Sequence, residues 1–244
     1  MGTLINVVGI VGGGLVGLLA GKVLNDRFRK TINVAMGLSV IALAISGIVA
    51  EMLEISETAD VHDIATKGTY VIIFSLVLGG IIGELIDVDS QMERLGSWLK
   101  YKTGNAKDIA FIDAFVTASL TVCIGAMAVV GAIMDGITGD HSILITKAIL
   151  DFVIIMAMTA GMGKGAIFSA IPVGIWQGAI TLLARLISPI MNDLALSNLS
   201  MVGSILIFCV GINIIIEGRG RIKVANLMPA IIFAVAAAYI PFLN

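Results

Sequence analysis

Long apolar runs, separated by short polar segments, dominate the amino-acid sequence. A helix needs about 20 mostly apolar residues to cross the ~30 Å hydrocarbon core of a bilayer. Eight runs come near that length, and they cover residues 3–24, 32–53, 69–88, 109–134, 142–161, 166–187, 198–216 and 228–243. The pattern predicts an all-α, polytopic bundle of about eight transmembrane helices in one domain of residues 1–244. The last run is the shortest and contains Pro241 near its end, so whether it spans the bilayer fully is left open.

Composition agrees with this pattern and excludes other classes of protein. Hydrophobic residues make up 58% of the 244 residues and charged residues 13%, whereas a soluble domain is roughly half apolar and about one quarter charged. The excess apolar surface requires lipid as its solvent. No basic patch is large enough to indicate nucleic-acid binding. The first run follows no positively charged segment and is long enough to span, which predicts a retained helix rather than a cleaved signal peptide.

Basic residues alternate between successive loops. They gather after the first, third, fifth and seventh runs: Lys22, Arg27, Arg29, Lys30, Arg94, Lys100, Lys102, Lys107, Lys164, Arg219, Arg221 and Lys223. Cytoplasmic loops of membrane proteins carry an excess of Lys and Arg. We therefore expect both the N- and the C-terminus to lie outside the cytoplasm.

The segment after the third run has the pattern of an amphipathic helix. Met92, Leu95 and Leu99 recur at helical spacing, with Trp98, Tyr101 and several lysines beside them. This pattern predicts a helix lying in the inner membrane interface. A loop helix packed on the bundle fits the same pattern.

Two parts of the chain resemble each other. At a shift of 165 positions the matching pairs are Gly9 and Gly174, Gly13 and Gly178, Asn33 and Asn198, Met36 and Met201, and Ser39 and Ser204. The third and eighth runs share an Ile-Ile-Phe sequence, at 72–74 and 231–233. The predicted repeats, 3–88 and 166–243, flank a central pair of helices in 109–161. Matching helices lie five apart, so the two copies cross in opposite directions, as in the inverted repeats of transporters. Convergent apolar composition is the alternative explanation.

Glycines in the first run recur at every fourth position. Gly9, Gly13, Gly17 and Gly21 form one flat ridge on the predicted helix. A neighbouring helix can approach such a ridge closely, because no side chain stands in the way. We expect a packing face, either within the chain or in a homo-oligomer.

The central helices carry charged residues within apolar sequence. Lys147 and Asp151 stand four apart, on one helical face, and Asp151 falls near the predicted bilayer centre. A Lys or Asp at that depth costs about 2.5–3.5 kcal/mol on insertion scales and marks a functional site by default. An intrahelical ion pair that only fixes helix packing is the alternative.

The preceding helix adds polar residues at the same spacing. Asp113, Thr117, Thr121 and Gly125 repeat at every fourth position, Ser119 and Cys123 lie on a neighbouring face, and Asp135 closes the outer end. The small residues from Thr121 to Ala126 predict a locally unwound helix, which is tolerated at membrane depth where it is buried or lines a cavity. Hydroxyl groups that bond back to their own helix explain any single Ser or Thr equally well.

We predict that Lys147 pairs with Asp151 or with Asp135. Gln177 and Pro172 in the sixth run, Asn6 in the first and Asn213 in the seventh are candidates to complete a polar lining. The resulting pathway for a small ion or solute comprises Lys147, Asp151, Asp113, Thr117, Ser119, Thr121, Cys123, Gly125, Asp135 and Gln177.

Features of an enzyme are not found. His62 and His141 both fall in predicted loops, and no nucleophile elbow, His-Glu helix motif or cluster of metal ligands is present. We expect no enzymatic activity, no metal and no cofactor.

Several stretches resemble a known family. The opening sequence 1–6 with Gly12-Gly13-Gly14, the stretch 123–136, the segments 138–140, 146–147 and 150–151, and the sequence 168–172 resemble domain-of-unknown-function family 554, the YqgA/YdfK-like bacterial membrane proteins. The resemblance covers essentially the whole chain. It implies a polytopic protein of the bacterial cytoplasmic membrane and no established substrate.

Two functions follow as hypotheses. In a transporter or channel, Asp151 would bind a proton or Na⁺, and Lys147 would be a competing cation or an anion contact. In a non-transporting scaffold or sensor, the glycine ridges would build an oligomer and the charges would only fix helix packing.

Overall fold

The structure is a computed structural model that describes residues 1–58, 61–216 and 221–243. Helices account for most of it: α1 (Gly2–Val23), α2 (Asp26–Met52), α3 (Thr69–Ile86), α4 (Val88–Lys102), α5 (Phe111–Cys123), α6 (Ala126–Ile137), α7 (Ser142–Met162), α8 (Ala170–Leu182), α9 (Ala184–Ile187), α10 (Asp193–Ile215), α11 (Val224–Leu227) and α12 (Ala230–Ala237). Short 3₁₀ helices cover Lys164–Ser169, Ser188–Ile190 and Pro241–Leu243. An antiparallel hairpin of β1 (Leu53–Thr58) and β2 (Val61–Thr66) joins α2 to α3.

Helices long and apolar enough to cross a membrane confirm the membrane class. Among the described residues six helical segments qualify, one of them the 3₁₀ helix Lys164–Ser169 continued by α8, and the bent pair α5–α6 raises the number to as many as seven. The run 228–243 forms only short helices, with an apolar helical segment from Val224 to Ala237. Pro229 directly precedes α12, and Pro241 begins the last 3₁₀ helix. Proline cannot continue a helix without loss of a backbone hydrogen bond. The count of eight spans therefore remains a prediction.

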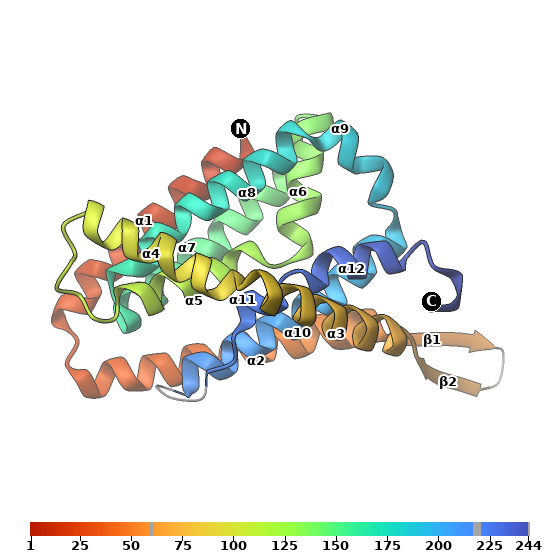
Figure 1. The fold of residues 1–244 in the computed structure, drawn as a ribbon, viewed down its shortest axis with the longest axis horizontal. Coiled ribbons are helices and arrows are strands. Elements are labelled where there is room, and N and C mark those ends of the chain that lie inside the picture. Colours follow the sequence, from red (N-terminus) through yellow and green to blue (C-terminus); the bar gives the residue numbers. More distant parts are fainter. Residues whose placement is uncertain (59–60, 217–220, 244) are drawn as a thin grey trace.

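Figure 1 shows the helices in two groups. The helices α1, α6, α7 and α8 lie in the upper part of the view and α2, α3, α10 and α12 in the lower part, with α5 and α11 between them. The largest core cluster includes Ile10 of α1, Ala118 of α5, Ile155 of α7 and Leu206 of α10. The two groups therefore share the largest core cluster, to which α5 contributes.

The glycine ridge of α1 packs against α7. Gly9, Gly13, Gly17 and Gly21 lie in turn against the backbone oxygens of Ala148, Phe152, Met156 and Ala160. Both sets of residues advance by four, so the two helices run parallel in a fixed register. Of the two packing faces predicted for the ridge, the structure shows the one within the chain.

Three other helix pairs pack in antiparallel fashion. The helix α1 meets α8, where Asn6 contacts Gln177, and α2 meets α10, where a Cβ atom on Gly37 would touch Ile215. The third pair joins α3 to α11 and α12, where Gly79 abuts Ala230. In each pair a helix of the first 86 residues meets one from the last 75 of the chain.

The amphipathic segment forms α4, which packs on the bundle. Gly96 lies against the ring of Phe115 and Leu99 is buried, whereas Trp98 and Tyr101 are 56% and 72% exposed. Lys102 lies 5.8 Å from the ring centre of Trp98. One face therefore contacts α5, and the other presents aromatic and basic side chains.

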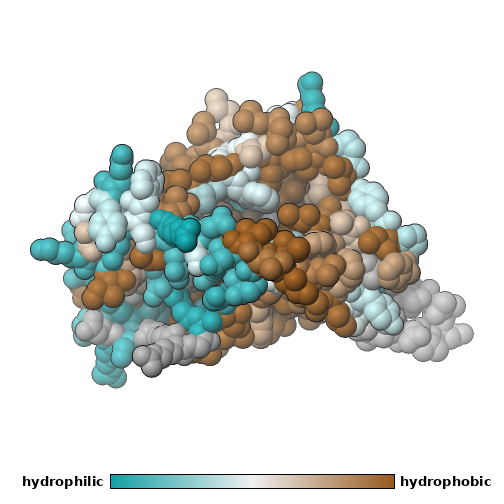
Figure 2. All heavy atoms as spheres, in the orientation of Figure 1, coloured by the Kyte–Doolittle hydropathy of each residue, from teal (hydrophilic) through white to brown (hydrophobic). Residues whose placement is uncertain are grey.

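The outer face of the molecule is apolar over large areas. Large hydrophobic side chains that are at least half exposed include Leu4, Val8 and Leu19 of α1, Ile149 of α7 and Leu182 of α8. Figure 2 shows hydrophobic residues over much of one face and hydrophilic residues gathered towards its left side. A soluble monomer rarely exposes apolar patches of this size, whereas lipid covers them without cost.

Candidate functional site

Lys147 and Asp151 form a buried ion pair on α7. Lys147 Nζ lies 2.5 Å from Asp151 Oδ2, and the two side chains are only 8% and 5% exposed. Residues four apart share a face of a helix, so the local sequence alone brings the two groups together. Of the two partners predicted for Lys147, the structure shows Asp151.

The same ammonium group contacts a break in the neighbouring helix. Lys147 Nζ donates a hydrogen bond of 2.9 Å to the carbonyl oxygen of Val122, near the end of α5. Ile124 is extended and Gly125 has φ 144°, a conformation that L side chains rarely adopt. The helix restarts at Ala126 after a bend of 62°. The predicted unwinding between Thr121 and Ala126 is confirmed, and it leaves carbonyl groups of α5 free to accept bonds from outside the helix.

Two buried amides complete this cluster. Asn6 Nδ2 donates to Gln177 Oε1 at 3.1 Å, both residues have no exposed surface, and the Asn6 side chain lies close to the Asp151 carboxylate. Within the described part of the chain, Asn6 Oδ1 and Gln177 Nε2 have no hydrogen-bond partner. We call Asn6, Lys147, Asp151, Gln177 and the Val122 carbonyl the central polar cluster.

The hydroxyl groups of α5 are directed elsewhere. Ser119 and Thr121 donate to the carbonyl oxygens of Phe115 and Thr117, at 2.7 and 2.8 Å, within their own helix. These two hydroxyls follow the alternative explanation, in which the helix itself satisfies them. Ser119 and Cys123 also line an apolar cavity of about 260 Å³, as does Pro172, so Pro172 lies in an apolar rather than a polar lining.

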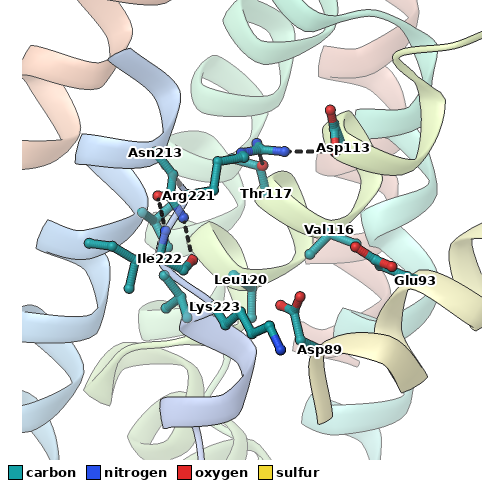
Figure 3. Close-up of a pocket in the computed structure, with 12 residues that line it drawn as sticks. Asp89, Glu93, Asp113, Val116, Thr117, Leu120, Asn213, Arg221, Ile222 and Lys223 are labelled. Atoms are coloured by element: carbon teal, nitrogen blue, oxygen red, sulfur yellow. Dashed lines mark hydrogen bonds and ion pairs between the residues drawn. The ribbon is translucent and has the colours of Figure 1, made fainter. Parts of the chain in front are cut away.

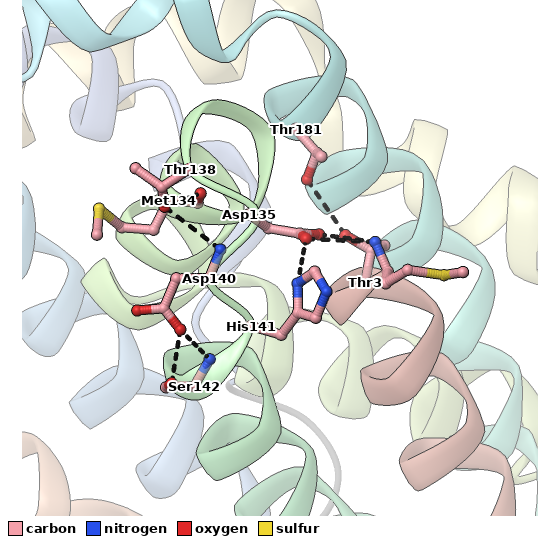
Figure 4. Close-up of polar contacts among 9 residues, drawn as sticks. Thr3, Met134, Asp135, Thr138, Asp140, His141, Ser142 and Thr181 are labelled. Carbon is pink, nitrogen blue, oxygen red and sulfur yellow. Dashed lines mark hydrogen bonds and ion pairs between the residues drawn. The ribbon is translucent and has the colours of Figure 1, made fainter.

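Asp135 lies in a separate polar cluster near the first residue of the chain. Its carboxylate is 1% exposed, accepts from the Met1 amino group at 3.2 Å through both oxygens, and lies 2.5 Å from His141 Nδ1 (Figure 4). Thr3 and Thr181 share a hydrogen bond of 3.3 Å beside it. The carboxylate of Asp135 therefore has partners other than Lys147. The side chain of the second histidine, His62, lies outside the described residues.

Asp113 and Thr117 face a third polar site, around Arg221. Arg221 Nη1 lies 2.7 Å from Asp113 Oδ1, and Arg221 Nη2 donates to Thr117 Oγ1 at 3.0 Å (Figure 3). Asn213 fixes the backbone next to Arg221, because its amide donates to Ile222 O and accepts from Ile222 N, at 2.7 and 2.9 Å. Asn213 therefore orders this segment rather than completing the central polar cluster.

Two cavities meet at this ion pair. One of about 230 Å³ is lined by polar residues that include Asp89, Asn213 and Arg221, and one of about 330 Å³ shares Asp113, Asn213 and Arg221 with it. Burial raises the pKa of the Asp89 carboxyl group, and the charge of Lys223 opposes that rise. The Arg221–Asp113 pair thus lies at the boundary between the two cavities.

Sequence reasoning did not select Arg221 as a site residue. It counted Arg221 only among the loop charges that set orientation, and Arg219 of the same loop lies outside the described residues. The available signal is that Arg221 follows Asn213 closely in the sequence. A polar residue near a helix end can hydrogen-bond the backbone of the segment that follows, and such a bond orders the residues next to it. Contact with Asp113, more than 100 positions earlier, has no local signature.

A metal centre is not assembled by the described residues. No group of three or more His, Cys, Asp or Glu side chains among them is placed to hold a metal ion. Cys123 and Cys209 are both free thiols.

Comparison with known proteins gives the family. The model of the family described as "Protein of unknown function (DUF554)" matches residues 1–239. The chain belongs to the DUF554 family. It is 27% identical to the "Uncharacterized membrane protein YdfK" of Bacillus subtilis (strain 168) over 231 residues, which cover 95% of this chain and 92% of that protein. It is 26% identical over 238 residues to the "Uncharacterized protein YqgA" of Escherichia coli (strain K12), with 96% and 94% of the two chains covered.

The family membership supports a membrane protein and agrees with the apolar helices of the fold. No solved structure matches the chain. The DUF554 resemblance noted from the sequence is therefore confirmed.

Proposed function

We propose that this DUF554 protein is an integral membrane transporter or channel for a small ion or solute, with the central polar cluster as its functional site. The observation that carries the proposal is a Lys–Asp pair, enclosed among candidate spanning helices, whose ammonium is bonded to the end of a broken helix. Burying such a pair rarely stabilises a protein relative to apolar residues. A functional reason for keeping both charges is therefore favoured.

The parallel register of α1 and α7 supports a crossing by the broken pair α5–α6. The candidate spans α2 and α3 lie between α1 and α7 in the chain. Two intervening crossings would make α1 and α7 antiparallel, whereas three make them parallel, as the contacts of the glycine ridge require. On this argument α5 and α6 together form a broken span rather than a re-entrant loop. Broken spans supply ion or substrate sites in transporters.

The three antiparallel helix pairs support the inverted repeat. The pairs α1 with α8, α2 with α10, and α3 with α11 and α12 join segments that correspond in the predicted repeats 3–88 and 166–243. Corresponding elements of two inverted copies run in opposite directions and meet across the axis that relates them. The central polar cluster takes Asn6 from one copy, Gln177 from the other, and its charges from the central helices.

The proposed location is the bacterial cytoplasmic membrane, with both termini outside. This orientation rests on the alternation of basic loops. It places the Arg221–Asp113 pair and its two cavities on the cytoplasmic side of the protein. Leu120 lines the nearer cavity, and Val122, two residues further along α5, binds Lys147. Only a short stretch of α5 then separates a polar cavity from the buried pair.

A scaffold or sensor remains the second candidate function. The burial of both charged side chains favours it, because a permeation site must exchange with water. In the transporter the same burial belongs to an occluded conformation, one of the states that alternating access requires. Lipids are the expected surroundings in either case, and a homo-oligomer is compatible with both.

Access of water to Gln177 separates the two functions. In a variant with Cys123→Ala and Cys209→Ser, Gln177→Cys is treated with a membrane-impermeant thiol reagent from each side of native membrane vesicles. The transporter predicts labelling from at least one side. Ser75→Cys is the matched control, since Ser75 is fully buried in α3 at a distance from the cluster, and it should stay unlabelled. A folded Gln177→Cys variant that the reagent does not label from either side would favour the scaffold.

A further inference from the structure

The central polar cluster provides oxygen acceptors around one ammonium group. Lys147 Nζ lies 2.5 Å from a carboxylate oxygen of Asp151 and 2.9 Å from the carbonyl oxygen of Val122. Carboxylate and carbonyl oxygens are also the ligands that hard metal cations prefer. The ammonium thus occupies a position that suits a metal cation of the same charge.

The broken helix strengthens the preference for positive charge. Val122 belongs to the last turn of α5, whose carbonyl groups carry the negative end of the helix dipole. In transporters, the C-terminal ends of half-helices and unwound carbonyls coordinate Na⁺ or protonated groups. An anion at this position would meet the Asp151 carboxylate and the negative end of the helix dipole, so the cluster disfavours it.

Two amide atoms of the cluster have no partner, which points to a missing ligand. Asn6 Oδ1 and Gln177 Nε2 are buried without a hydrogen bond among the described residues. Exchanging O and N on both amides keeps the Asn6–Gln177 bond and again leaves one oxygen and one N–H without a partner. A buried polar atom without a partner is costly, so a small ligand or a water is expected there. In either orientation the unpartnered amide oxygen is a third type of acceptor within the cluster.

The charge of the cluster sets the valence of the ligand. Without Lys147, Asp151 is the one formal charge among the five groups of the cluster. A monovalent cation balances one carboxylate, whereas a divalent cation would leave an uncompensated charge in a buried site.

We propose that the central polar cluster is a binding site for a monovalent metal cation, and that Lys147 is a tethered occupant which the free cation displaces. The proposal rests on the proposed transport function and names the class of ion that the site takes. Displacement moves the ammonium away from Val122 and Asp151 and leaves their oxygens, together with the amide oxygen, to the cation. Exchange between a fixed and a free cation gives the site two states with the same charge.

Thermal stability in detergent tests the proposal without any need for transport. Lys147→Met removes the tethered cation, and its Tm is measured in NaCl, LiCl, KCl and choline chloride at equal ionic strength. We expect at least one metal cation to raise the Tm by about 5 °C over choline at a concentration near one hundred times Kd. The double variant Lys147→Met with Asp151→Asn is the control and should show no difference between the salts.

A second variant covers the case in which Lys147→Met does not fold. Asn6→Asp is isosteric, keeps Lys147, and adds an anionic oxygen where the amide now lacks a full set of partners. It should show a metal-cation-dependent rise in Tm of the same order. If neither variant distinguishes metal cations from choline, the proposal is overturned and water fills the site.

Flux in proteoliposomes separates this proposal from the transport function. A cation-dependent Tm in a protein that carries no ion across vesicles would leave the binding site standing and remove the transporter. If the protein carries a solute but its Tm does not respond to metal cations, the transport function stands and the cation site is removed.

Discussion

Gly13 of α1 lies directly on the backbone carbonyl of Phe152 of α7, with no room between them for a Cβ atom. The contact is one of four along the glycine ridge, and it sets the depth at which α7 holds Lys147 and Asp151 beside Asn6. The packing of small residues is therefore tied to the position of the charged pair. Membrane helices associate largely through such close packing, because lipid offers no hydrophobic gain for bringing them together.

Substitution in the glycine ridge should separate α1 from α7. We expect Gly13→Ala to destabilise the protein by about 1–3 kcal/mol, because the added methyl group must push a backbone rather than a flexible side chain. Gly12→Ala is the matched control, since its Cβ would lie 3.5 Å from the ring of Phe152, an ordinary contact. Thermal unfolding in detergent measures both variants. Equal Tm values for Gly12→Ala and Gly13→Ala would contradict the packing described here.

Removing one partner of the buried ion pair should lower the free energy of unfolding more than replacing both partners by apolar residues. Lys147→Met leaves Asp151 charged and without its ammonium partner, with an expected loss of about 3–5 kcal/mol in the absence of a bound cation. The double variant Lys147→Met with Asp151→Leu removes both charges and should recover most of that stability. Unfolding free energies in a mixed-detergent titration provide the measurement. A double variant no more stable than the single one would show that the charges are not coupled.

The same double variant separates stability from function. Under the transport proposal it folds but loses flux, because the polar cluster is its site. A scaffold would keep both assembly and cellular function in this variant. Oligomeric state is read by light scattering and flux by ion-sensitive dyes inside proteoliposomes, in parallel on the same preparations.

The Arg221–Asp113 pair should contribute far less energy than the buried one. Asp113 is 64% exposed in its side chain and Arg221 29%, so solvent screens their attraction. We expect a double-mutant cycle of Arg221→Ala and Asp113→Ala to give a coupling energy below about 1 kcal/mol, and to fall further in high salt. A salt-independent coupling of several times that size would mean that the pair is shielded from solvent.

Asp140, in the loop before α7, should give the protein an acid-sensitive contact. The Ser142 hydroxyl and backbone N–H donate to Asp140 Oδ1 at 2.6 and 2.9 Å, and they lower the pKa of this carboxyl group below its usual value. A lowered folded-state pKa gives stability that is present above the unfolded pKa, about 3.9, and is lost as pH falls through the folded one. Ser142→Ala should reduce this dependence.

Comparison of the Tm of wild type and Ser142→Ala across the pH range 7 to 3 tests this contact. The difference between the two proteins should be present at neutral pH and shrink as the pH falls. A constant difference over the whole range would assign the effect to the helix terminus and not to the Asp140 carboxylate.

Sequence alone determined the features that depend on local periodicity. The apolar runs, the four-residue spacing of the glycine ridge and the spacing of Lys147 and Asp151 are properties of single helices, so the chain specifies them without reference to its neighbours. The break before Ala126 is of the same kind, because it depends on a glycine that can take a positive φ.

Only the tertiary structure decided which helices meet. Asn6 and Gln177 lie 171 positions apart and Asp113 and Arg221 more than 100, and no pattern in either helix encodes the rotation that brings them together. The apolar pattern is a weak guide here, since lipid and the bundle interior accept similar side chains and leave the helix faces nearly equivalent. The partner of each face is chosen by the packing of all helices at once. For this reason the sequence predicted a glycine ridge and a charged pair. The fold showed that the glycine ridge of α1 packs against α7, the helix that carries the charged pair.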